Sequence, residues 1–298
     1  MKIEGFIIKS LINKILALFL SLVLLLSSGL NIVSFAESES GVDDTKRDVR
    51  VFLNEAFFTI TVHGKGLIIN NIEPLTKTIK IPESIFNLKV LGVNNCKNYG
   101  LDKITFEGYI YIIDNCEFEA QEIEFNSVNQ IKDCKIIGEE EVIFRGEIVT
   151  FKDCEITAQL IEFENKINKM GNCTIDVEEM VFREEMGTIN DCEIEVQLIE
   201  FKNKVNKIEK GKINAGVIKF EDELKEIEDC NLKNTMLFAV LKNETESFIE
   251  KFLSVLPENY NFEFLDCDDE FNCYVLKENL DEETKKEYDA FSVFEEPD

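Results

Sequence analysis

Six cysteines recur at nearly constant spacing in the middle of this 298-residue chain, and the thiol is the most reactive side chain that it repeats. A thiol can act as a nucleophile beside a base, bind a soft metal ion or form a disulfide. Each of these roles requires different companions. The six residues are Cys116, Cys134, Cys154, Cys173, Cys192 and Cys230.

We call these six residues the cysteine column. The neighbouring residues that metal binding or catalysis would need are missing around it. Cysteine metal ligands usually come as close Cys-x-x-Cys pairs with further Cys or His, and Gly211 even replaces one member here. The only histidine, His63, lies outside the column, so no unit holds the base that a nucleophilic thiol needs. We therefore interpret the column, with Cys96 as its candidate first member, as small apolar filler at an inward corner. No catalytic residue, metal site or cofactor is predicted.

Disulfides are a separate question. Stacked strands lie about 4.8 Å apart, which is close enough, but in-register stacking aims the thiols alongside each other, which suits disulfide geometry poorly. Cys267 and Cys273 differ, because FLDCDDEFNCYVL places them on what reads as two strands of a hairpin. A disulfide between these two could form, and the sequence leaves it open.

Phenylalanine shows what positions the cysteines, because it recurs every 19 residues. The column comprises Phe106, Phe125, Phe144, Phe163, Phe182, Phe201 and Phe220. A fixed period of this kind indicates a stack of structural repeats. A single coil buries too few apolar side chains to offset the entropy lost on ordering its 19 residues, so it is stable only when neighbours stack on it.

Each repeat alternates apolar and polar residues in two segments, as strands do, with Asn or Asp at the corner before the cysteine. We predict a mainly β fold, a right-handed parallel β-solenoid or leucine-rich-repeat-like array. Seven repeats cover 104–235, after a loose polar leader (37–49) and an N-terminal cap with irregular first repeats (50–103). A small α/β module at 236–298 would follow, with helices at 244–256 and 281–288.

The N-terminus has the order of a secretory signal peptide. Lysines precede the apolar run ILALFLSLVLLL, and small residues at Ser34 and Ala36 favour cleavage after Ala36, which makes 1–36 the signal. An uncleaved membrane anchor over 15–33 is the alternative, and is the only membrane contact predicted. The formal net charge of −27 argues against nucleic acid as a partner.

Two stretches carry a resemblance to a known family. IKIPESI (Ile79–Ile85) and IEFENKINKMG (Ile161–Gly171) resemble the units of BspA-like leucine-rich repeat domains, although glutamate stands at the usual proline and the Ala-Phe pair is missing. The units here are also shorter. The resemblance implies a secreted or cell-surface protein that binds proteins or glycans, often in adhesion. The long lysine-bearing N-terminus suits a Gram-positive-type bacterium.

Three functions therefore compete. The first is a non-catalytic interaction module for an unknown protein or glycan, with a basic partner drawn to an outward, mostly acidic stripe. The second is a β-helix polysaccharide lyase or hydrolase that uses surface carboxylates. The third is a self-associating structural surface protein. The stripe comprises Glu124, Ile143, Glu162, Val181 and Glu200.

The predicted export signal leads to a direct test. Expression of this 298-residue chain in a Gram-positive host should release a protein whose N-terminal residue is Glu37, because signal peptidase cleaves after small residues. N-terminal sequencing of the secreted protein measures this. Recovery of the intact chain in the membrane fraction would support the anchor instead.

Overall fold

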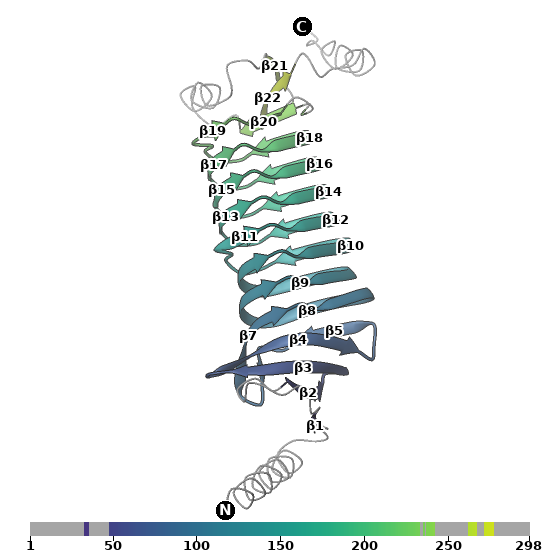
Figure 1. The fold of residues 1–298 in the computed structure, drawn as a ribbon. Coiled ribbons are helices and arrows are strands. Elements are labelled where there is room, and N and C mark those ends of the chain that lie inside the picture. The colour runs from purple at the N-terminus through teal and green to yellow at the C-terminus, as the bar shows by residue number, and fades with distance from the viewer. Residues whose placement is uncertain are drawn as a thin grey trace, which may run out of the picture.

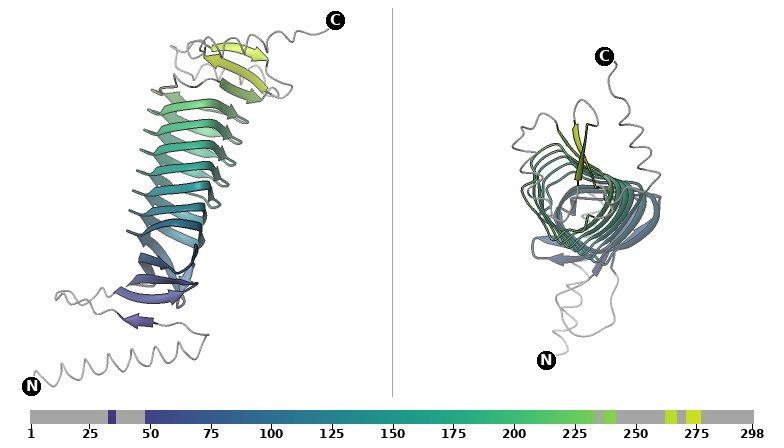
Figure 2. Two further views of the ribbon diagram at one scale, coloured as in Figure 1. Left: turned by 90° about the vertical axis from the view of Figure 1, so that its right-hand side faces the viewer. Right: turned by 90° about the horizontal axis from the view of Figure 1, so that it is seen from above.

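The chain forms a parallel β-solenoid of about nine coils, seen in a computed structural model that describes residues 33–35, 48–232, 235, 237–241, 262–266 and 271–276 (Figure 1). Viewed along the stack, the coils superpose on one another around a common interior (Figure 2). The predicted mainly β, stacked fold is confirmed.

One coil consists of a long strand and a short strand, as in β12 (Glu155–Phe163) and β13 (Ile167–Gly171), before β14 (Thr174–Phe182) begins the next coil. β12 and β14 pair in parallel with an offset of 19 residues, so Ile156 lies beside Ile175 and Phe163 beside Phe182. The two alternating segments predicted for each repeat are the halves of one long strand. The stretch between Ile167 and Met170 is extended, not helical.

The same two-strand pattern continues through the stack, and Figure 1 shows the long and short strands as two ladders. The remaining strands of this part are β8 (Lys97–Asp114), β9 (Glu117–Lys132), β10 (Lys135–Phe144), β11 (Thr150–Lys152), β15 (Met186–Asn190), β16 (Glu193–Phe201), β17 (Val205–Glu209), β18 (Lys212–Phe220) and β19 (Ile227–Glu228).

The N-terminal end of the stack is antiparallel. β2 (Asp48–Leu53) pairs with β3 (Ala56–His63), and β3 pairs with β4 (Gly66–Pro74), all antiparallel. Beyond them, β4 pairs in parallel with β7 (Leu88–Asn94), where the stack starts. The shorter strands here are β5 (Thr78–Ile81) and β6 (Ser84–Ile85), and β1 (Val33–Phe35), from the end of the predicted signal, pairs with β2.

The C-terminal end is also closed by antiparallel strands. β20 (Leu237–Leu241) adds in parallel to β18, and then pairs antiparallel with β22 (Phe271–Leu276). β22 forms the predicted hairpin with β21 (Phe262–Asp266). The two predicted helices of this module lie outside the described residues.

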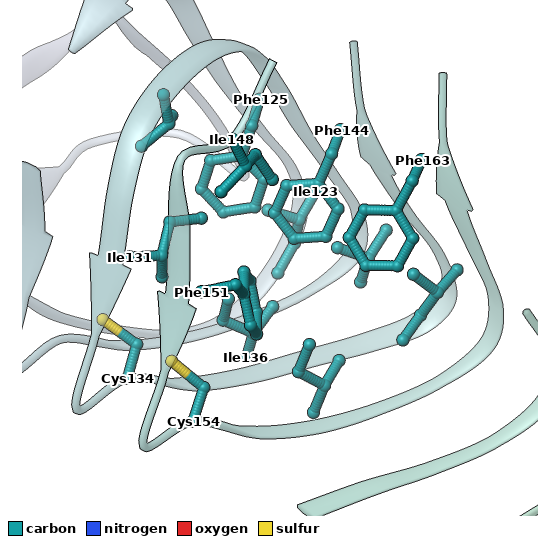
Figure 3. Close-up of a cluster of buried hydrophobic side chains, with 14 of the residues drawn as sticks. Ile123, Phe125, Ile131, Cys134, Ile136, Phe144, Ile148, Phe151, Cys154 and Phe163 are labelled. Atoms are coloured by element: carbon teal, nitrogen blue, oxygen red, sulfur yellow. The ribbon is translucent and has the colours of Figure 1, made fainter. Parts of the chain in front are cut away.

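The phenylalanines form a continuous inner ladder that runs along the core. Successive rings in the column from Phe106 to Phe220 have centroids 4.5 to 5.1 Å apart and are nearly parallel. Phe151 lies edge-on to Phe144 and Phe163, with centroids 5.6 and 6.3 Å away (Figure 3). Aromatic pairs in such arrangements contribute about 0.5–1.5 kcal/mol each beyond their buried area.

The corner before each cysteine has left-handed backbone geometry, with φ between 51° and 57°. Asn and Asp adopt this conformation more readily than other residues with side chains, because they hydrogen-bond nearby backbone. The predicted corner role is therefore confirmed, and Lys210 is the exception in the column. The corner residues are Asn95, Asn115, Asp133, Asp153, Asn172, Asp191, Lys210 and Asp229.

Gly211 occupies the cysteine position without needing to be a glycine. A Cβ added there would lie 3.6 Å from the Cys192 carbonyl oxygen and 4.0 Å from the Cys230 Sγ, which are ordinary contacts, and its φ is not positive. We expect Gly211→Ala to raise the free energy of unfolding by about 0.4–1 kcal/mol, because it reduces the entropy of the unfolded chain. Denaturant unfolding measures the change.

A second glycine provides the matched control. At Gly187, an added Cβ would lie 2.1 Å from the Asn168 carbonyl oxygen, so the backbone must shift. Gly187→Ala should therefore destabilise the protein by about 1–3 kcal/mol through overpacking. Equal effects of the two substitutions would contradict the register of the stack.

Candidate functional site

The cysteine column lies inside the solenoid, where the sequence analysis placed it. Its members are buried and free, and Cys96 belongs to it. The thiols hydrogen-bond to backbone carbonyls of their own corner, as from Cys134 Sγ to the Lys132 oxygen at 2.9 Å. Cys134 and Cys154 occupy equivalent corners of neighbouring coils (Figure 3). Each thiol therefore fills a turn and satisfies its polar atom there.

The surroundings raise the pKa of most of these thiols, whereas hydrogen bonds with the neighbouring Cys154 and Cys192 thiols lower the pKa of Cys173. The adjacent Cys116 thiol, together with burial, raises the pKa of Cys134 to about 12. Burial also raises the pKa of Cys230. Because the thiolate is the form that attacks electrophiles and binds metals, buried neutral thiols of this kind suit packing and not chemistry.

Two further predicted site residues cannot be placed in full. Cys267 lies outside the described residues, so the predicted disulfide with Cys273 is not addressed. The backbone of Cys273 lies in β22, opposite Leu265 of β21.

The predicted acidic stripe exists as a row across neighbouring coils. Backbone pairing sets Ile143 beside Glu124 and Glu162, and Val181 beside Glu162 and Glu200. Val181 is buried although it points outward, at 5% exposure. The stripe is therefore a covered row of side chains and not an open anionic surface.

The stripe carboxylates are covered because arginine and lysine side chains of the same coil or the next coil pair with them. Arg145 Nε donates to Glu124 at 2.6 Å, and this guanidinium lowers the pKa of Glu124. Arg183 pairs with Glu162 in the same way. Lys202 and Lys219 hold Glu200, at 2.9 and 3.1 Å. The negative charge of the stripe is thus largely neutralised within the fold.

A group of carboxylates without ion-pair partners lies on another face, which the sequence analysis did not select. Asp176, Glu178, Glu179 and Glu195 point outward from β14 and β16 and, within the described part of the chain, have no ion-pair partner. We call these four residues the acidic face. Lys135 and Lys212 form ion pairs with its neighbours Glu155 and Glu193. A per-coil charge count on the outward positions would have indicated it.

The surface is also hollowed on this face. Two shallow, open depressions lie side by side on it, and Glu178 and Gln197 line both. Thr157 and Asn214 border one of them with neutral polar groups. The arrangement offers carboxylates and amides to a partner laid across several coils, with no enclosed space for a small molecule.

None of the described residues forms a cluster of three or more His, Cys, Asp or Glu side chains suited to a metal ion. No helix within the described ranges is long and apolar enough to cross a membrane.

Comparison with protein-family models, with curated proteins and with solved structures finds no match. The function of this solenoid is therefore argued from its own surfaces.

The burial of the thiols leads to a prediction about their reactivity. In the folded protein at about pH 8, the column cysteines should not react with Ellman's reagent, because they are buried away from it. They should react at once in concentrated guanidinium chloride. A Cys267→Ser/Cys273→Ser variant removes the background from the other two thiols. Fast modification of any column cysteine in the native state would show an activated thiol.

Proposed function

We propose that this protein is a secreted or cell-surface interaction module without catalytic activity, and that the acidic face binds a protein with a basic surface. The observation that carries the proposal is the contrast between the two anionic surfaces. The stripe carboxylates are held by arginine and lysine, whereas Asp176, Glu178, Glu179 and Glu195 lie together and unpaired.

Like charges placed side by side across stacked strands destabilise a sheet, so this arrangement costs the fold stability. Asp176 pairs directly with Glu195, and both point outward. At another such position the chain places a lysine beside a glutamate on the neighbouring coil, where Lys212 forms an ion pair with Glu193. A cationic partner would remove the repulsion and speed encounter through electrostatic steering.

The location rests on the sequence. The lysine-bearing apolar N-terminus and the small residues before Glu37 support export. Membership of the BspA-like leucine-rich repeat family is part of the same proposal, supported by the units quoted above. Long, regular repeat surfaces of this kind commonly serve binding.

No specific observation favours either of the other two functions, the polysaccharide enzyme and the self-associating surface protein. A polysaccharide lyase or hydrolase needs a carboxylate set aside for acid–base work, and self-association needs a surface free of mutual repulsion. Both stay predictions from the sequence.

Neutralising the acidic face tests the proposal. The Asp176→Asn/Glu178→Gln/Glu179→Gln/Glu195→Gln variant should bind a lysine-rich peptide about tenfold more weakly at about 50 mM salt, because four exposed charge contacts of a few tenths of a kcal/mol are lost. Titration by biolayer interferometry measures the affinity.

A matched variant separates local from total charge. Glu55→Gln/Glu83→Gln/Asp102→Asn/Glu184→Gln removes the same charge from exposed positions elsewhere. It should weaken binding by less than about twofold. Equal weakening by both variants would mean that the peptide senses only net charge, and the acidic face would lose its assignment.

A further inference from the structure

A second surface of the solenoid is rich in exposed apolar groups. Four large apolar side chains are exposed together on the short-strand side of the first coils: Leu91 at 39%, Tyr109 at 52%, Tyr111 at 50% and Val149 at 40%. We call them and their half-buried polar and apolar neighbours the tyrosine patch. Its other members are Ile112, Ser127, Asn129, Gln130 and Thr150.

Backbone register makes the patch continuous over four coils. Gly92, which follows Leu91, pairs with Ile112, and Ile112 pairs with Gln130. Gln130 in turn pairs with Thr150, and the Val149 nitrogen donates to the Asn129 oxygen at 2.9 Å. The patch is therefore a strip along the rod whose nine residues carry aromatic rings, amides and hydroxyls, and the exposed Glu147 borders it beside Val149.

The same repeat positions carry ion pairs farther along the rod. In the row of Tyr109, Lys166 pairs with Glu185 at 3.1 Å and Lys204 with Glu223 at 2.6 Å. In the row of Ile112, Lys207 pairs with Glu226 at 2.9 Å. The fold thus accepts charged ladders on this side, so stacking alone does not demand exposed tyrosines in the first coils.

We propose that the tyrosine patch binds a neutral polysaccharide. Sugar rings place weakly positive C–H groups against the negative face of an aromatic ring, while amides and hydroxyls bond their hydroxyl groups. A linear polymer of identical units suits a strip that repeats from coil to coil. The strong negative charge of the chain disfavours anionic polysaccharides here.

The size of the patch disfavours a protein partner or a second copy of this chain. Stable protein interfaces use about 20–30 residues on each side. The patch has nine, and the ion-paired rows lie directly beyond it. The site is separate from the acidic face, so either binding activity could fail without the other.

The experiment is co-sedimentation of the full-length protein with suspensions of cellulose, chitin and β-1,3-glucan. We expect binding to at least one of them, and a half-saturating concentration raised about tenfold or more in Tyr109→Ala/Tyr111→Ala. Binding should persist in about 0.5 M salt, which would abolish a contact made by the acidic face. The chain has no tryptophan, so tyrosine fluorescence provides an independent readout.

Tyr99→Ala is the matched control, because Tyr99 is also 52% exposed but lies on the long-strand half of β8. It should leave binding within about twofold of the unchanged protein. If the double variant fails to fold, Val149→Lys provides the test, because it places a charge within the patch at an exposed site. It should weaken binding as much as Tyr109→Ala/Tyr111→Ala is expected to.

Three results would overturn the proposal: no binding to any neutral polymer, equal binding by the double variant, or preferential binding to an anionic polysaccharide. Sedimentation velocity adds a fourth. A dimer that Tyr109→Ala/Tyr111→Ala dissociates would assign the patch to self-association.

Discussion

In-register parallel stacking is the constraint on which the rest of this structure depends. Once residue n lies on residue n plus 19, every column must tolerate its own type as a neighbour. Phenylalanine tolerates this because offset rings attract, and cysteine tolerates it because a neutral thiol is small and bonds to its corner. Carboxylates do not, which is why the acidic residues of this chain need an arrangement of their own.

The chain resolves that problem in two ways. Along the stripe and on the short-strand side, cations occupy adjacent positions or coils, as Arg145 does between Glu124 and Glu164. Such exposed pairs contribute little stability individually, but they remove repulsion between coils. On the acidic face that compensation is missing, and the nine residues of the tyrosine patch carry no charge of their own. The three surfaces therefore differ in what they can bind, although the backbone beneath them is the same.

The period carried most of the information that the sequence offered about this fold. The 19-residue spacing of Phe106 and Phe125 fixes the register, and Asn or Asp before each cysteine marks the left-handed corner. The antiparallel pairing of β2 with β3 was not predicted, because those strands belong to no repeat and pair by tertiary context.

The surfaces were harder to predict than the core. The 19-residue period was enough to identify the row from Glu124 to Glu200. Whether a carboxylate in such a row has an ion-pair partner depends on long side chains that reach over from the next coil. Arg183 and Glu162 are 21 positions apart in sequence, and their pairing becomes apparent only when outward residues are compared two repeats at a time. The same comparison identifies the unpaired carboxylates of the acidic face. It also shows that the row of Tyr109 continues as a row of ion pairs in later coils.

The direction of the hydrogen bonds between coils has a mechanical consequence. These bonds run along the rod, so tension applied between its ends loads them one coil at a time, and a coil detaches without disturbing those beyond it. Each detached coil of 19 residues would release up to about 63 Å of slack at about 3.3 Å per residue. The rod would then lengthen in even steps under load, with the antiparallel closures at its two ends setting the force at which peeling begins.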